Sequence, residues 1–103
     1  MTPDEAVADA LERSSVKSGM TARYAVRRNS RFFGHVEAHL NTHGSHAPQD
    51  WDLTWNLTWQ NDDGSFQERA SEDLEALLQP FGDVDLALAM ASAPGFGSGR
   101  QQL

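Results

Sequence analysis

The sequence predicts an α+β fold in which two helices pack on one face of an antiparallel sheet of three to five strands. Two patterns predict it. Residues 51–60 alternate strictly between apolar and polar side chains, as a strand with one buried face does. Segments before and after the strand region carry apolar stripes at helical spacing. The expected order is helix, three or four strands, helix and a final strand.

The first element is a helix that begins after Thr2. Thr2 can cap the helix and form a capping box with Glu5, and Pro3 suits the first helical position. An apolar stripe then predicts which face of the helix meets the sheet. This stripe consists of Ala6, Val7, Ala10 and Leu11.

Three strands are expected next, at about residues 21–27, 31–41 and 51–60. Each alternates between apolar and polar side chains, so that one face of the sheet is apolar and the other polar. The apolar face meets the helices and forms the core. We expect the core to contain Trp51, Trp55 and Trp59.

The turn between the first two strands depends on register. A two-residue loop at Asn29 and Ser30 would split both apolar rows between the two faces of the sheet. A three-residue loop, with Arg28 or Arg31 added, keeps one face consistently apolar, and we therefore expect that loop. It places Tyr24, Val26 and Phe32 on the apolar face and Phe33 on the polar one.

The second half of the chain predicts the remaining elements. Residues 61–64 form a strong turn, and residues 65–70 a short return strand. Ser71 is expected to cap a second helix, in which Leu74, Leu77 and Leu78 share one face. Residues 84–91 alternate and predict a last strand; a helix is the alternative because they are rich in alanine.

Domain organisation and location follow from composition. Residues 1–93 are expected to form a single domain, and residues 94–103 a flexible tail. The chain has no cysteine, which excludes a disulfide scaffold and thiolate chemistry. No secretory leader or bilayer-length apolar run is present, which indicates a cytoplasmic protein. The absence of isoleucine and the excess of arginine over lysine indicate GC-rich coding DNA, as in some bacteria and their phages.

The polar face of the sheet is one candidate surface. Among its expected residues, His35, Glu37 and His39 are weak candidates for metal ligands, because alternate residues of a strand share a face. His35 and His39 would lie about 13 Å apart along the strand, so both cannot bind one ion without a bulge. No nucleophile triad or phosphate loop is present, and we expect no cofactor and no enzymatic activity.

Charge is distributed unevenly along the chain, whose net charge is −7. Residues 1–40 hold six basic and five acidic residues, net +1, whereas residues 41–103 hold two basic and ten acidic residues, net −8. The first hairpin is therefore basic and the second half of the chain acidic. The candidate partner-binding residues are Asp50, Asp52, Asp62, Asp63, Glu72 and Asp73 on the acidic part, and Arg23, Arg27, Arg28, Arg31 and Phe33 on the hairpin.

These features predict a small acidic interaction protein that is not an enzyme. We expect an inhibitor of the immunity or phage anti-defence type, which binds a basic surface of a nucleic-acid-handling protein by charge complementarity. We do not expect the chain to bind nucleic acid directly. The first alternative is a dimeric adaptor or chaperone that pairs through its sheet as a homodimer. A small metal-binding protein that uses His35, Glu37 and His39 is the second.

Overall fold

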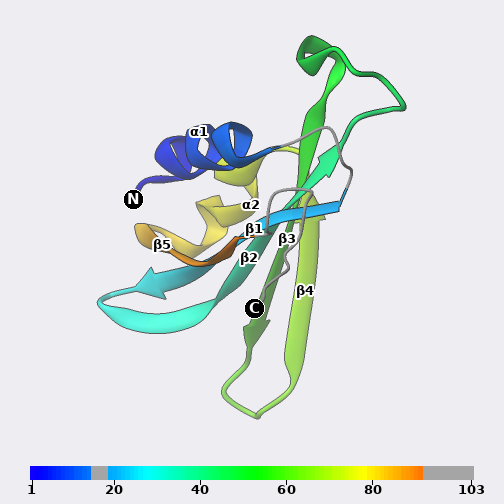
Figure 1. The fold of residues 1–103 in the computed structure, drawn as a ribbon. Coiled ribbons are helices and arrows are strands. Elements are labelled where there is room, and N and C mark those ends of the chain that lie inside the picture. Colours follow the sequence, from blue (N-terminus) through cyan, green and yellow to red (C-terminus); the bar gives the residue numbers. More distant parts are fainter. Residues whose placement is uncertain (15–18, 92–103) are drawn as a thin grey trace, which may run out of the picture.

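The computed structural model describes residues 1–14 and 19–91, which form one five-stranded antiparallel sheet with helices on one face (Figure 1). This confirms the expected α+β fold and the last strand. The elements are α1 (Pro3–Arg13), β1 (Gly19–Arg28), β2 (Arg31–Asn41), β3 (Asp52–Gln60), β4 (Phe66–Ser71), α2 (Leu74–Leu78) and β5 (Val84–Ala91), with short 3₁₀ turns at Pro48–Asp50 and Gln79–Phe81. The expected tail lies outside the described residues. Within the described part of the chain, no helix is long and apolar enough to cross a membrane.

The strands lie in the order β4-β3-β2-β1-β5. The chain leaves β4 at one edge, crosses the covered face as α2, and returns as β5 at the opposite edge, beside β1 (Figure 1). Both turns of the two hairpins, β1–β2 and β3–β4, therefore lie at one end of the sheet, and the β2–β3 loop at the other.

The core fills the space between the helices and the apolar face of the sheet. Tyr24, Trp55 and Leu57 are almost completely buried there, and α2 adds three buried leucines. Trp51 and Trp59 pack against the same core and are partly buried. The alternating pattern of residues 51–60 thus placed the three tryptophans correctly.

The β1–β2 turn differs from the expected one. It is a two-residue loop in which Asn29 and Ser30 both have positive φ, 54° and 63°, as a tight hairpin turn requires. The register then shifts by one residue between Val26 and Arg27, so that Val26 lies opposite Gly34. An extra residue in β2 thus restores the apolar face that a plain two-residue loop would split.

The bulge reverses the expected positions of two phenylalanines. Phe33 turns to the helix side, where its ring lies 5.8 Å from the Trp59 ring and 4.8 Å from the Phe81 ring. Phe32 lies on the opposite face, 63% exposed, with its ring 5.0 Å from the His35 ring. The expectation that Phe33 faces outwards was wrong, because strict alternation does not hold across a bulge.

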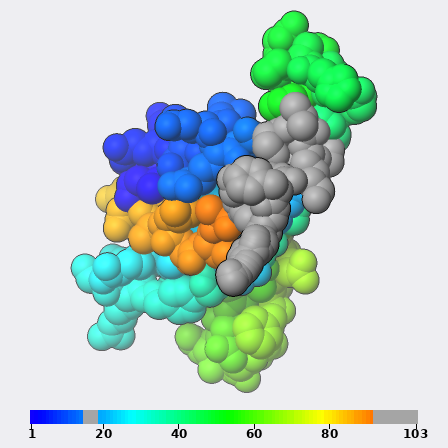
Figure 2. Space-filling view, viewed as in Figure 1, coloured from blue at the N-terminus to red at the C-terminus, as the bar shows by residue number. Residues whose placement is uncertain are grey.

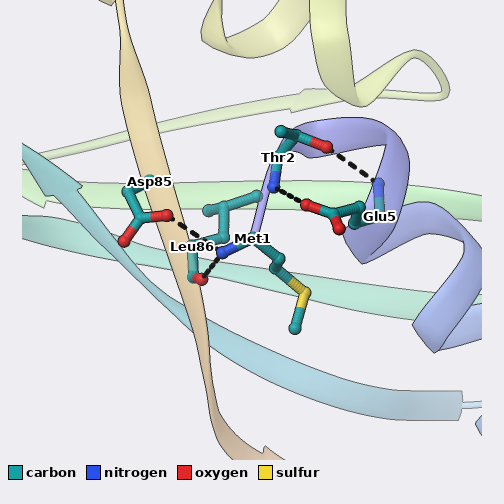
Figure 3. Close-up of polar contacts among 5 residues, drawn as sticks. All are labelled: Met1, Thr2, Glu5, Asp85 and Leu86. Carbon is teal, nitrogen blue, oxygen red and sulfur yellow. Dashed lines mark hydrogen bonds and ion pairs between the residues drawn. The ribbon is translucent and has the colours of Figure 1, made fainter.

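The helix starts are set by hydrogen bonds of their caps. The capping box of α1 is present: the Thr2 hydroxyl accepts from the Glu5 amide at 3.2 Å, and the Glu5 carboxylate accepts from the Thr2 amide at 2.8 Å (Figure 3). The expected cap of α2 was two residues too early. Asp73 caps that helix by accepting from the Ala76 amide, while Ser71 still pairs with Trp55 as the end of β4.

The N-terminal residue joins α1 to β5. The amino group of Met1 donates to an Asp85 carboxylate oxygen at 2.9 Å and to the Leu86 carbonyl at 2.5 Å (Figure 3). The Leu86 amide in turn donates to the Met1 carbonyl at 2.9 Å. The amino group holds the pKa of Asp85 below its usual range, because it stabilises the charged carboxylate.

Candidate functional site

A groove with a volume of about 670 Å³ lies on the helix side of the sheet, between α1, the start of β3 and the start of α2. Its apolar lining residues are Pro3, Val7, Leu11, Trp51, Leu53, Trp55 and Leu74. Leu11 belongs to the apolar stripe of α1 but is 51% exposed, because the stripe is wider than the contact with the sheet. Apolar surface that faces such a groove is available to a partner.

Trp51 is held in place at the edge of the groove. Its indole Nε1 donates to the Ser45 carbonyl at 2.9 Å, in the loop that precedes β3. The hydroxyl of Ser45 donates to the Asp50 carboxylate at 2.9 Å. This loop therefore fixes the orientation of an amphipathic side chain that is partly buried, a type of residue that often anchors protein interfaces.

Carboxylates surround the apolar part of the groove. Five acidic residues line it, and no lysine, arginine or histidine is among the described lining residues. The acidic residues are Asp4, Asp52, Glu72, Asp73 and Glu75. The carboxylates of Asp4, Glu72 and Glu75 are on exposed residues and make no hydrogen bond or ion pair to other described side chains. They are free to meet a cation.

The structure separates the acidic residues that the sequence grouped together. Asp52, Glu72 and Asp73 line the groove, and Asp50 lies on the neighbouring 3₁₀ turn. Asp62 and Asp63 lie in the β3–β4 turn, about 30 Å from Asp52 along β3. That separation is several times the Debye length in physiological salt, about 8 Å, so the turn contributes little to the field at the groove.

Sequence reasoning missed two of the acidic groove residues, Asp4 and Glu75. The available signal was the width of the α1 stripe: Val7 and Leu11 lie beyond the two alanines that the sheet buries. Leftover apolar surface beside a helix start indicates a second contact on that side.

The basic residues of the first hairpin do not form one patch. Arg23 lies in the middle of the polar face and is paired with Glu37, with 2.8 Å between its Nε and the carboxylate. Arg27 donates to the Ser30 carbonyl and lies opposite Asp85 of β5. Arg28 places its guanidinium 5.8 Å from the centre of the Phe33 ring. Arg28 and Arg31 pair across the turn from its two sides; both are exposed, and neither side chain makes a hydrogen bond or ion pair to another described residue.

The histidines of β2 do not gather into a metal centre. Burial favours the neutral form of Glu37, but hydrogen bonds from Arg23 and His39 outweigh burial and hold the pKa of Glu37 below its usual range. His35 instead lies against the Phe32 ring. In residues 1–14 and 19–91, no group of three histidine or acidic side chains is arranged to hold an ion.

No protein-family model, curated protein or solved structure matches this chain significantly. The geometry of the described residues is therefore the basis for an argument about function. It provides two surfaces of different character, the acidic groove beside α1 and the polar face of the sheet.

Proposed function

We propose that this protein is a small interaction protein that inhibits a nucleic-acid-handling protein by occupying its basic surface, in the manner of immunity or anti-defence proteins. The acidic groove carries the proposal: its described lining residues place five carboxylates, and no cation, around an apolar floor. Surfaces that bind nucleic acid are rich in lysine and arginine, and carboxylates accept paired hydrogen bonds from arginine much as phosphates do.

The two parts of the groove have different roles in such a complex. The carboxylates attract a basic partner over a distance and raise the rate of association, an effect that salt screens. The apolar floor around Leu11 and Trp51 supplies the area that leaves water on binding and so slows dissociation. A net charge of −7 also disfavours direct binding to phosphate backbones, which supports a protein partner.

The test begins with affinity capture from lysate of the native host at low and high salt, followed by kinetics on the salt-sensitive partner. Replacing Glu72 and Glu75 with lysine should slow association about tenfold, because steering depends on charge near the contact. The rate should be measured by stopped-flow fluorescence.

A matched variant carries lysine at Glu12 and Asp83, two exposed acidic residues outside the groove. Both variants change the net charge by the same amount, and we expect at most about a twofold effect from this control. Equal association rates for the two variants would contradict a role for the groove.

A further inference from the structure

The two helices cover the sheet unevenly. α1 contacts β1 and β5, and α2 contacts β3 and β4, so the helices lie side by side on one face (Figure 1). α2 has only five residues, about 7.5 Å of helix, whereas α1 has eleven. The pairing of β4 with β3 ends at Ser71 and Trp55, so the first residues of β3 extend beyond β4. Among the described residues, no α-helix therefore lies beside α1 over the start of β3, and the acidic groove occupies this place.

α1 presents a second apolar ridge to the groove. Its first ridge contains Ala6 and Ala10, which are completely buried. Pro3, Val7 and Leu11 are spaced four residues apart, and all three line the groove. Residues at this spacing form one ridge of a helix, of the kind that packs into a neighbouring helix. The ridge is about 12 Å long, a little over two turns.

Free carboxylates lie on both sides of the groove. Asp4 belongs to α1, whereas Glu72 and Glu75 lie at the start of α2. The other two carboxylates already have partners: Asp73 caps α2, and Asp52 lies 3.0 Å from a histidine ring of the preceding loop. The groove thus offers an apolar strip with an unpaired negative charge on either side.

We propose that the groove takes a basic amphipathic helix of the partner, which lies beside α1 and completes the helix layer. The apolar face of this helix meets Leu11 and Trp51, and arginines on both sides of that face pair with the carboxylates. The inference rests on the proposed function, because it takes the groove as the surface that meets the basic partner.

The surroundings of the groove favour a helix over an extended segment. One wall is a helix and the floor is the apolar face of the sheet, which is the setting in which α1 and α2 themselves pack. An extended segment would instead pair with a free strand edge, where main-chain groups lack partners.

The position of α1 leaves room for such a helix at the margin of the molecule. Figure 2 shows α1 in blue at this margin and the β2–β3 loop in green projecting beyond it. The same loop holds Trp51 through the Ser45 carbonyl. Because the ridge spans little more than two turns, the contact is small, and we expect micromolar affinity for the isolated helix.

Fluorescence anisotropy with labelled synthetic peptides tests the inference. The probe is a peptide of about 18 residues, five turns of leucine, alanine and arginine, with the leucines on one face and arginines beside them. One control peptide has the same composition in an order that gives no apolar face, and a second carries proline in its middle. The probe should bind and gain helical circular dichroism, whereas both controls should bind at least about tenfold more weakly. No binding of the probe, or equal binding of either control, would overturn the inference.

A change in the apolar ridge tests the place of binding. Leu11→Ser should weaken binding of the probe about tenfold, because the leucine meets the apolar face of the helix. Phe66→Ser removes a large exposed side chain outside the groove and should change the affinity less than about twofold. Leu11 and Phe66 are 51% and 70% exposed, so the fold should tolerate both changes, as near-ultraviolet circular dichroism will show. Equal losses in the two variants would exclude the groove as the site.

Charge variants separate this inference from the proposed function. Glu72→Lys with Glu75→Lys should weaken binding of the probe about tenfold, and Glu12→Lys with Asp83→Lys much less. If the probe does not bind but association of the captured partner still depends on Glu72 and Glu75, the helix is excluded and the proposed function stands. If the probe binds in the groove but the captured partner handles no nucleic acid, the helix stands and the proposed function is excluded.

Discussion

At the scale of single residues, one carboxylate joins α1 to the sheet. Tyr24 is completely buried, and its hydroxyl donates to Asp9 Oδ2 at 2.6 Å. Arg13 Nε donates to the same oxygen at 2.9 Å. The two hydrogen bonds hold the pKa of Asp9 below its usual range, and the one from Tyr24 has the larger effect. Burial, and the hydrogen bond to Asp9, raise the pKa of Tyr24. The hydrogen bond from Tyr24 thus links the helix to β1, while Arg13, which belongs to the same helix as Asp9, adds a second donor to the carboxylate.

Replacing Tyr24 with phenylalanine should destabilise the protein by about 1–2 kcal/mol at pH 7, since the variant loses a hydrogen bond to a charged group. The lowered pKa of Asp9 contributes stability above its unfolded pKa, about 3.9, and this contribution disappears as pH falls through the folded pKa. Urea unfolding at pH 7 and at lower pH should therefore show that the free energy of unfolding falls less with acidification in the variant than in the unchanged protein. Parallel pH profiles for the two proteins would contradict this assignment.

At the scale of elements, the β2 bulge decides which phenylalanine stabilises the fold. Phe33 contacts Trp59 and Phe81 on the helix side, whereas Phe32 is mostly exposed. Because Phe33 is only partly buried, Phe33→Ala should cost about 2–3 kcal/mol, below the 3–5 kcal/mol of a fully buried phenylalanine. Phe32→Ala, its matched control, should cost under about 0.5 kcal/mol. Thermal unfolding of both variants measures the difference. Equal destabilisation by the two changes would contradict the placement of Phe33 on the helix side and of Phe32 on the exposed face.

The same hairpin shows what patterns along the chain can predict. Residues 51–60 keep strict alternation, so the burial of Trp55 followed from the sequence. The bulge in β2 could not be predicted in the same way. A three-residue loop without a bulge and a two-residue loop with a bulge both keep one face apolar, and the pattern does not distinguish them. The tight turn places both Asn29 and Ser30 at positive φ, which asparagine tolerates but serine does not favour, so residue preference did not indicate it. The Asp73 cap could not be predicted for a related reason. Ser71 pairs with Trp55 of β3, so β4 runs one residue further than the sequence pattern indicated and the helix starts later.

At the scale of the whole molecule, the groove shows why a candidate site is harder to predict than a fold. The excess of acidic residues after residue 40 is evident from the sequence. Which of them meet depends on contacts between distant segments: Asp4 of α1 joins Glu72 and Glu75 only because α1 packs beside α2. Asp62 and Asp63 stay apart because a whole strand separates them from the groove. Charge counts therefore predict a partner class, and packing selects the residues.

The acidic groove should also lower stability in the free protein. Five carboxylates around one concave surface repel one another, and no cation is among the described lining residues. Asp52 lies 3.0 Å from the His43 ring, so the repulsion is only partly compensated. Raising sodium chloride from about 10 to 500 mM shortens the screening length from about 30 Å to a few ångströms, so the thermal midpoint should rise.

The rise should be smaller in a Glu72→Gln, Glu75→Gln variant, because fewer like charges remain to be screened. Differential scanning calorimetry measures it, with Glu12→Gln, Asp83→Asn as the matched control that should keep most of the wild-type salt response. An equal salt response in the two variants would show that the charge repulsion is spread over the whole chain, and would contradict its concentration at the groove.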